Sequence, residues 1–506
     1  MRFRPISTIT VLSITLSTIA HAATINVPAD HPTIQQAIDA AINGDEIVIA
    51  QGTYLEHIDL LGKAITLRST DPNDPVVVAA TIIDGGNDPD APGFPQNSGT
   101  VVSCKNDEGP DTLLLGLTVT GGAAPGVLDG GGLGAFEANP TVTNCRFVDN
   151  HAANPSAFGA GAFCGFGGSV VFTGCEFIGN SGGRGPGLYI ADSPVSVIDC
   201  LFRNNTGRSF GGAFATVANP SITLRDCTFE NNTTTDNGGG AYLSGNINGA
   251  VIEVTDCDFI ENSSTEDGGG GMYITRGDVT VTGCLIRDNS ADFAGGGVST
   301  NFNTSMTITQ CTFENNSVTR SGGGLSIFLA ESSISDCQFS GNTALGSGGG
   351  MSLGGSGSTH RVTGCTFDGN EGDDGGAAAC TLSSFEFENC TVMNNHATND
   401  GGGLRFSNTA SVTLTNNNFE LNSADDSGGG VSMSADAMSV RNCDFTGNTA
   451  GGSGGGFRNG TAGALSEVVG CTFINNSATR SGGGASEFAS GATVQYVWKT
   501  VTYSTF

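Results

Sequence analysis

Basic side chains are scarce in this sequence, which has 19 Lys and Arg residues against 49 Asp and Glu residues and a formal charge of -30. Such an acidic surface repels phosphate groups, so nucleic acid and anionic membranes are excluded as partners. The same charge suits cations, a basic partner or a salty medium.

Long apolar runs are also missing beyond the first residues, so we expect that the chain is not an integral membrane protein by itself. Residues 1–22 have the pattern of a secretory signal peptide. Arg2 and Arg4 form its positive start, residues 9–19 are apolar or hydroxylic but too few to span a bilayer, and residues 20–22 read Ala-His-Ala, a small-residue cleavage site. The sequence therefore predicts a secreted or cell-surface protein.

Zinc-type cysteine spacing is absent as well, because no C-x-x-C occurs among the 15 Cys and the six His are scattered. Disulfides are the usual alternative in an exported protein. All but Cys104, Cys164 and Cys380 occupy one position of a repeat, however, and side chains that stack in parallel register rarely meet the torsion angle of a disulfide. We therefore expect buried free thiols.

The repeat reads Cys-x-Phe-x-x-Asn, a short polar run, two or three glycines and an apolar residue, and it extends from about residue 141 to 487. Cys200 and Cys227 are 27 residues apart, which is a typical step, and Asn417 stands where one copy lacks the Cys. The sixth position is always Asn: Asn150, Asn180, Asn205, Asn232, Asn262, Asn289, Asn316, Asn342, Asn370, Asn395, Asn422, Asn448 and Asn476.

A period of this size with three short strand patterns predicts one coil of a single-stranded parallel β-solenoid. Alternation predicts which residues of the copy around Cys227 point into the lumen: Ile222, Leu224, Cys227, Phe229, Ala241 and Leu243. Thr223, Thr228 and Tyr242 are expected to point outward. The Phe side chains should stack, the Asn amides should bond to the coils above and below, and the glycines should allow sharp turns.

The start of the mature chain predicts a short helix and several strands. Thr33 and Gln36 form a capping box, and residues 34–41 have one apolar helical face that ends by Gly44. Strand patterns follow at 45–49, 52–58 and 63–67. This opening, over residues 25–86, resembles the right-handed parallel β-helix proteins of the pectin-lyase-like superfamily. The resemblance implies an all-β, right-handed parallel β-helix with a short N-terminal capping helix.

The repeats resemble those of chlamydial polymorphic outer membrane proteins and of related bacterial autotransporter passengers. The matching residues are Phe229 and Asn232 with the glycines before Ala241, and equivalent sets in later copies. This resemblance implies an exposed, adhesive rod at the bacterial cell surface or outer membrane. That family exports its rod through a C-terminal barrel, which the few residues from Gly491 to Phe506 cannot form, so either the chain is truncated or export uses another route.

The sequence is accordingly divided into four parts. Residues 1–22 are the signal peptide, 23–116 the N-terminal cap and first rungs, 117–491 the repeat β-helix and 492–506 a C-terminal tail.

Two sets of candidate site residues stand out against this regular pattern. Carboxylates two positions before the glycines recur in several copies and would repel one another when stacked, which predicts bound Ca²⁺ at Asp236, Glu266, Asp373 and Asp426. Simple solvation of these turn residues is the alternative. Tyr242 and Tyr273 point outward from adjacent copies and are candidate contacts for a sugar or a protein. No cofactor other than Ca²⁺ is expected.

Catalytic motifs are missing. The lyases of the pectin-lyase-like superfamily are expected to have an Arg base within R-x-P-x-x-R, which does not occur here. Two pairs of consecutive acids, which begin at Asp373 and at Asp425, lie at polar turns and do not face each other across a cleft as the carboxylates of a hydrolase do. The sequence favours a non-catalytic adhesin-like or envelope rod that binds a cell-surface polysaccharide or protein. A polysaccharide lyase or other carbohydrate-active enzyme is the main alternative. Ice or surface binding through Thr-x-Thr pairs such as Thr280 and Thr282 is a third.

Overall fold

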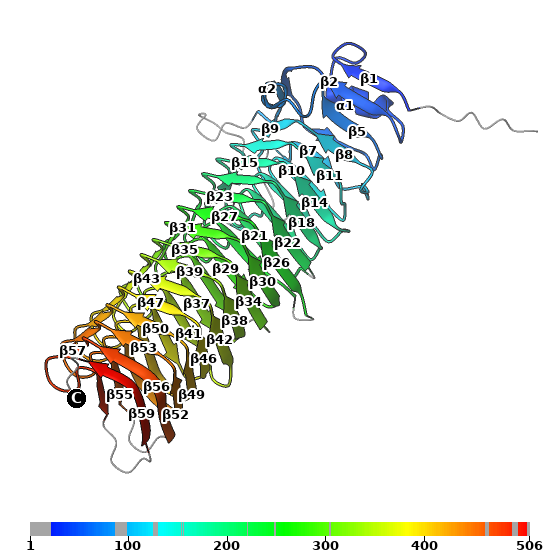
Figure 1. The fold of residues 1–506 in the computed structure, drawn as a ribbon. Helices are drawn as coiled ribbons and strands as arrows, with labels where there is room; N and C mark the ends of the chain where they lie inside the picture. Colours follow the sequence, from blue (N-terminus) through cyan, green and yellow to red (C-terminus); the bar gives the residue numbers. More distant parts are fainter. Residues whose placement is uncertain are drawn as a thin grey trace, which may run out of the picture.

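The computed structural model describes residues 22–86, 99–124, 130–152, 154, 156–219, 221–246, 249–302, 305–460, 465–487 and 494–502. The chain winds into a rod of parallel strands with about 15 turns (Figure 1). The two short helices lie at the N-terminal end, and the turns then follow one another along the rod in sequence order (Figure 1). The predicted all-β parallel β-helix is confirmed. Nearly all of the predicted signal peptide lies outside the described residues.

One turn of the rod contains three strands that line the lumen and a fourth, two-residue strand. For the turn around Cys227 these are β22 (Ser221–Arg225), β23 (Thr228–Glu230), β24 (Thr233–Thr234) and β25 (Ala241–Ser244). The next turn repeats them as β26 (Val251–Thr255), β27 (Asp258–Ile260), β28 (Ser263–Ser264) and β29 (Met272–Thr275). Each strand pairs in parallel with its equivalent in the next turn. Each turn therefore depends on its neighbours for its hydrogen bonds.

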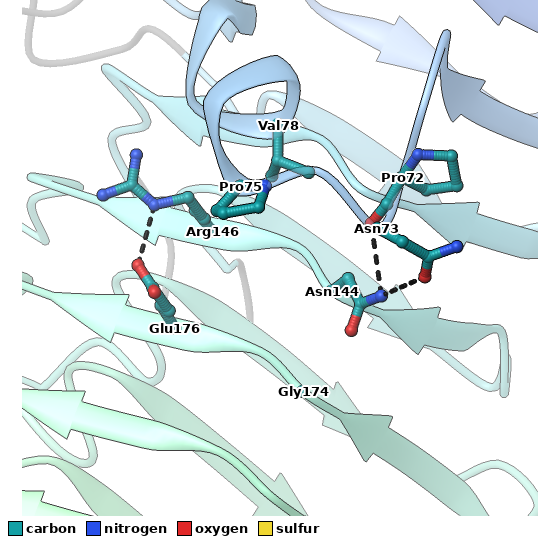
Figure 2. Close-up of a pocket in the computed structure, with 8 residues that line it drawn as sticks. All are labelled: Pro72, Asn73, Pro75, Val78, Asn144, Arg146, Gly174 and Glu176. Atoms are coloured by element: carbon teal, nitrogen blue, oxygen red, sulfur yellow. Dashed lines mark hydrogen bonds and ion pairs between the residues drawn. The ribbon is translucent and has the colours of Figure 1, made fainter.

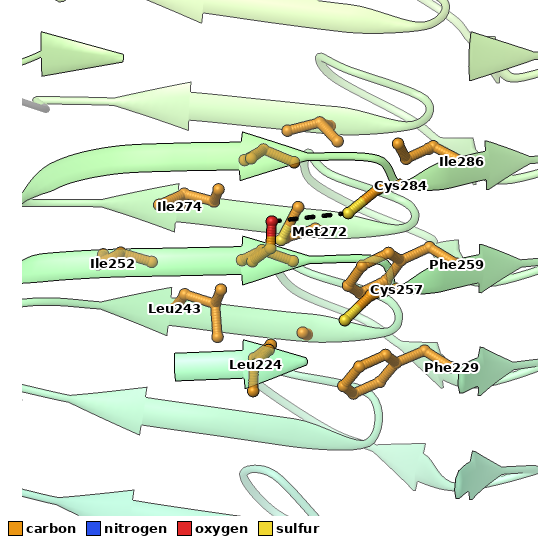
Figure 3. Close-up of a cluster of buried hydrophobic side chains, with 14 of the residues drawn as sticks. Leu224, Phe229, Leu243, Ile252, Cys257, Phe259, Met272, Ile274, Cys284 and Ile286 are labelled. Atoms are coloured by element: carbon orange, nitrogen blue, oxygen red, sulfur yellow. Dashed lines mark hydrogen bonds between the residues drawn. The ribbon is translucent and has the colours of Figure 1, made fainter. Parts of the chain in front are cut away.

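The lumen is filled as the alternation predicts (Figure 3). All six residues predicted to point inward around Cys227 are at most 1% exposed. The phenylalanine rings of consecutive turns stack in parallel: Phe202, Phe229 and Phe259 have centroids 4.6 and 4.7 Å apart. Ile286 interrupts this stack, and Phe313 resumes it with Phe339 at 4.6 Å. Offset stacking adds about 1 kcal/mol per pair to the burial of each ring.

The repeated asparagines form one continuous ladder. All thirteen are at most 2% exposed, and the Nδ2 of each one donates to the Oδ1 of the next at 2.9–3.1 Å. The same Nδ2 also donates to a backbone carbonyl, as Asn316 does to Ile286 O at 2.8 Å. The predicted hydrogen bonding is confirmed. The left-handed geometry that Asn tolerates lies one residue earlier, for example at Asn315 with a φ of 54°.

Left-handed backbone marks three corners of each turn, and in many turns also a fourth, after the strand that follows the glycines, as at Leu382 with a φ of 60°. The residue before the Cys position and the residue before the ladder Asn have φ values of 51–68° in every copy from Cys145 to Cys471, and these residues are mostly Asp, Asn or Gly. The third corner is a glycine such as Gly322, whose φ is 73° and where a Cβ would lie 2.4 Å from Leu325 O. Asx residues and glycine are therefore selected by the corners, because they adopt this region at the lowest cost.

The cysteine column lies inside the lumen. All 15 Cys are buried and none is paired in a disulfide. Each Sγ donates weakly to backbone carbonyls, as Cys311 does to Thr309 O at 3.4 Å and to Val281 O at 3.6 Å. Asn417, which replaces a Cys, is 2% exposed and uses its amide to accept from Cys390 N at 2.8 Å and to donate to Phe387 O at 2.9 Å. This position of the repeat can therefore be occupied by a thiol or by an amide whose polar groups are hydrogen-bonded.

The first turns close the N-terminal end of the lumen. Helix α1 (Ile34–Ala40) begins at Thr33, whose side chain accepts from Gln36 N, and buries Ile34, Ala37 and Ile38. The Glu56 carboxylate accepts from the first amides of the helix at 2.9 and 3.0 Å. Lys63 Nζ donates to the last carbonyls, including Ile38 O at 2.6 Å. Both ends of this short helix are therefore satisfied by residues between the strands of the first turns, which lets it act as the predicted cap.

Strands occur in each of the three predicted regions, but the pattern at 52–58 is divided into two strands and the one at 63–67 begins three residues later. The early strands are β1 (Thr24–Val27), β2 (Glu46–Ile49), β3 (Gly52–Leu55), β4 (Ile58–Asp59) and β5 (Thr66–Ser69). Helix α2 (Pro75–Ala80) was not predicted, although Asp74 as N-cap and Pro75 at the first helical position are a recognisable start signal. Neither α1 nor α2, nor any other described segment, is a helix long and apolar enough to cross a membrane.

Candidate binding face

One column of side chains that point away from the lumen runs along the rod on a single sheet, and seven of its thirteen members are buried. It consists of the second residue of β13 (Ala162–Gly165), of β17 (Leu188–Ala191) and of the equivalent strands after them, which pair in register. We call it the outer column: Phe163, Tyr189, Ala215, Tyr242, Tyr273, Ser299, Ser326, Ser352, Ala379, Arg405, Ser432, Arg458 and Ser486. It changes from aromatic to hydroxylic to ion-paired, so its chemistry varies along an otherwise uniform rod.

Tyr242 and Tyr273 form the exposed end of the aromatic part. Their rings are parallel, with centroids 5.5 Å apart and an interplanar angle of 2°, and both residues are partly exposed. Burial raises the pKa of Tyr242 to about 12, with a smaller contribution from Tyr273, and burial also raises the pKa of Tyr273. Both phenols are therefore neutral at ordinary pH. The structure places the two predicted contact residues side by side as the repeat implies.

Most of the aromatic cluster behind these tyrosines was not predicted from the sequence. Phe158 stacks on Tyr189 at 4.3 Å, and Phe210 packs on Tyr242 at 4.6 Å. The Arg184 guanidinium lies over both rings, 5.4 Å from Phe158 and 5.1 Å from Phe210. Phe158, Arg184 and Phe210 each directly precede a left-handed glycine, and that shared position was the signal that could have revealed them. The cluster anchors the tyrosine pair on one side.

A pair of carboxylates lies at the turns that lead to the tyrosine strands. Asn237 Nδ2 donates to Asp236 Oδ1 at 2.8 Å and to Asp267 Oδ2 at 2.9 Å, so one amide bridges two acids of adjacent turns. Burial raises the pKa of Asp267, and the neighbouring Asp236 carboxylate adds to the shift. Both carboxylates also raise the pKa of Tyr273, which indicates that acids and phenols share one local electrostatic environment.

The four predicted calcium ligands do not come together. The residue in register with Asp236 is Asp267 rather than Glu266, because the left-handed Gly238 and Gly269 set the register of these turns. Glu266 is exposed. Asp373 accepts from Thr398 Oγ1 at 2.8 Å, and Asp426 accepts from Ser427 Oγ at 3.2 Å.

Asn399 separates Asp373 from Asp426 in the stack of turns. Within the described ranges, no group of three or more His, Cys, Asp or Glu side chains is arranged to hold a metal ion. The predicted residues therefore fit a calcium centre poorly, although Asp236 lies near the Asp267 carboxylate of the adjacent turn.

Ion pairs occupy the C-terminal part of the outer column. Asp400 Oδ2 accepts from Arg458 NH1 at 2.8 Å and lies 3.6 Å from Arg405 NH2. Arg405 Nε is also 3.8 Å from Asp374 Oδ1, and burial raises the pKa of Asp374. The cluster is partly buried, since the Asp400 side chain is 10% exposed and the Arg405 side chain 18%. The repeat pattern does not reveal this cluster, because its acids and bases come from different turns.

Two hollows lie elsewhere on the rod. One, of about 170 Å³, lies where the segment before α2 packs on the sheet, and Figure 2 shows its polar groups satisfying one another. Asn144 Nδ2 donates to Pro72 O at 3.2 Å, and Arg146 pairs with Glu176 at 2.7 Å. These bonds therefore hold the segment before α2 against the first repeat strands. The other, of about 370 Å³, is open and is lined by small polar residues with Glu331 and Arg361 at its edge.

The sequence comparisons agree with this architecture. A family model described as a right handed beta helix region matches residues 97–253 and 243–392, which together are more than half of the chain. The chain belongs to the right-handed β-helix family. No curated protein matches the sequence of this β-helix. Family membership explains the fold but does not identify a ligand, and the outer column is the part of the rod where the surface chemistry varies.

Proposed function

We propose that this β-helix is a non-catalytic, adhesin-like rod on the outside of a bacterial cell, which binds a surface polysaccharide through the Tyr242 and Tyr273 end of its outer column. Its export rests on the secretory pattern of residues 1–22. The acidic charge of -30 suits a neutral or cationic polymer better than a polyanion.

The regularity of the rod is the observation that carries the non-catalytic part of the proposal. The asparagine ladder continues without a break from Asn150 to Asn476, so no turn within it is remodelled around a reacting group. The acids beside the outer column are held by amides or arginines, as Asp400 is by Arg458. A hydrolase needs a free pair of carboxylates with one pKa raised across a cleft, and these paired acids do not provide it.

The tyrosine pair supports the binding part. Tyr242 and Tyr273 combine partly exposed aromatic area with phenol hydroxyls, and the acids and amide of Asp236, Asn237 and Asp267 supply hydrogen-bonding groups beside them. Apolar ring faces combined with a few fixed polar groups are the usual composition of a ligand site. Sugars present both apolar C–H faces and hydroxyl groups, so this composition suits them.

Binding of the full mature chain to an array of bacterial and host surface polysaccharides tests this proposal. We expect saturable binding that weakens at least tenfold in a Tyr242→Ala and Tyr273→Ser double variant. These replacements copy Ala215 and Ser299, the residues that occupy the same column in adjacent turns, so the variant should fold. Thr280→Ala on another outer face is the matched control and should bind like the parent. Equal binding by the double variant would exclude this site.

Polysaccharide cleavage is the second candidate function. The observation in its favour is the gathering of Asp374, Asp400, Arg405 and Arg458 on one outer face, with a raised pKa at Asp374. Release of unsaturated uronate from pectin and related polymers in the presence of Ca²⁺ tests it. Turnover that disappears in an Arg405→Ala variant would replace the non-catalytic proposal.

A further inference from the structure

A histidine lies inside the lumen, where every other turn has an apolar or small residue. His360 belongs to β42 (Thr359–Thr363), and its column continues through the residues in register with it. These are Ile252, Val279, Met306 and Ser332 before it and Phe385 after it. His360 is 0% exposed, so the ring is enclosed by the stacked turns.

The contacts of His360 suit a neutral ring. Its Nδ1 lies 2.8 Å from Ser332 Oγ, and the ring stacks on Phe385 with centroids 5.1 Å apart and an angle of 15°. Its Nε2 is buried and has no hydrogen-bond partner in the described part of the chain. A protonated ring has two N–H donors, and the Nε2–H would find no acceptor here. The lumen therefore cannot satisfy the charged form.

No counter-ion lies inside the lumen beside His360. The charged residues of its own strand and of the neighbouring strands β38 (Glu331–Ser335) and β46 (Ser384–Glu388) are at outward positions: Glu331, Arg361, Glu386 and Glu388. Arg361 and Glu386 pair with each other on that outer surface. The other titratable groups of these turns that point inward are the buried thiols Cys337, Cys365, Cys380 and Cys390. Burial is the sole cause that lowers the pKa of His360, to about 4.

We propose that the turn carrying His360 is an acid-sensitive joint, at which protonation of the buried ring opens the rod locally. The turns of a solenoid contact only their neighbours, so one destabilised turn can open without unfolding of the whole rod. The joint lies between the tyrosine pair at Tyr242 and Tyr273 and the ion-paired cluster at Asp400. Acid would thus break the rigid connection between these two parts of the outer column.

The direction of the effect follows from proton linkage. The pKa of His360 is about 4 in the folded rod, against 6.5 for an ordinary histidine, so the open turn binds more protons between these values. Stability of the turn is therefore fully present above about pH 6.5 and falls as the pH drops towards 4. With these two values the open form gains about 20-fold in population at pH 5 relative to neutral pH.

Amide hydrogen exchange of the full mature chain, corrected for the intrinsic pH dependence of exchange, tests the joint. We expect protection in β38, β42 and β46 to fall by at least tenfold more than protection in β22 and β26 when the pH changes from 7 to 5. A His360→Phe variant, which copies Phe385 of the next turn, should remove this difference.

A His360→Val variant, which copies Val279, provides a second replacement if the larger ring packs badly. An equal fall of protection along the whole rod would overturn the proposal. Persistence of the local fall in either variant would also overturn it, because the effect would then have another source.

Discussion

The side chain of Asn316 donates from Nδ2 to the Oδ1 of Asn342 at 2.9 Å, and both residues are 0% exposed. Asn316 Oδ1 in turn accepts from both the backbone N and the Nδ2 of Asn289. The side chain of a ladder residue such as Asn316 thus forms hydrogen bonds with the ladder residues of both adjacent turns. The ladder holds the corner of each turn in register with the next one, and this is why it tolerates no other residue in thirteen copies.

Asn316→Ala should therefore destabilise the rod strongly. The change removes the two bonds that the Asn316 side chain donates and leaves two buried N–H groups of Asn289 without an acceptor, which costs about 3–5 kcal/mol in total. Local hydrogen exchange and denaturant unfolding measure the loss. Ser317→Ala, at the exposed next residue, is the control and should change stability by less than about 0.5 kcal/mol. An Asn316→Ala protein as stable as this control would show that the ladder contributes little.

A thiol count on denatured, unreduced protein should give 15 free thiols per chain. All Cys are buried, and burial raises the pKa of Cys104, Cys164 and Cys380, so these thiols are unreactive in the folded rod. Thiol reagents should accordingly modify almost no cysteine of the folded protein at pH 8. A count well below 15 after denaturation would establish disulfides in the lumen.

The left-handed corners predict two substitutions of opposite sign. Gly322→Ala places a Cβ against Leu325 O at a φ of 73° and should destabilise its turn by at least about 2 kcal/mol. Leu382 has a left-handed φ of 60°, which is costly for leucine, and its side chain is 53% exposed, so replacing it removes little packing. Leu382→Asn, which copies the left-handed Asn408 of the next turn, should stabilise by about 0.5–1 kcal/mol. Denaturation midpoints measure both, and a loss of stability in Leu382→Asn would contradict this account of the corners.

We expect calcium to act at the pair of Asp236 and Asp267. Bound Ca²⁺ relieves the repulsion between these carboxylates, so millimolar Ca²⁺ should raise the melting temperature above that in EDTA. Asp267→Asn should abolish the increase. Glu266→Gln is a matched control one residue away, outside the register of the pair, and should keep it. Identical melting curves in Ca²⁺ and EDTA would eliminate the site.

Tyrosine ionisation provides an alkaline test of the outer column. Because the pKa of Tyr242 is raised to about 12, its folded phenol stays neutral while an unfolded one ionises near pH 10. The stability associated with this burial is present below pH 10 and is lost between pH 10 and 12. Tyr242→Phe should reduce that loss and remove one tyrosine that ionises late in an ultraviolet titration. An unchanged titration would mean that Tyr242 is solvated.

The repeat made most of the fold predictable. The spacing of Cys227 and Phe229, the asparagine after them and the apolar residue after the glycines determine which side chains enter the lumen, and the structure confirms each of these placements. The helix cap at Thr33 was predictable for the same reason, because a capping box is a local signal. Local periodicity suffices in a solenoid, since each turn meets only turns of the same pattern.

The repeat pattern thus specifies the rod, its lumen and its ladder. Only the tertiary structure decided which outward residues meet: Asp236 with Asp267 rather than Glu266, Arg184 between two phenylalanines, and Asp400 with two arginines of other turns. The physical reason is register. Turns differ in length by several residues, and the left-handed glycines, rather than the count of residues, fix where each turn begins. The buried ring of His360 follows the same rule, because its environment is set by the turns stacked on either side of it.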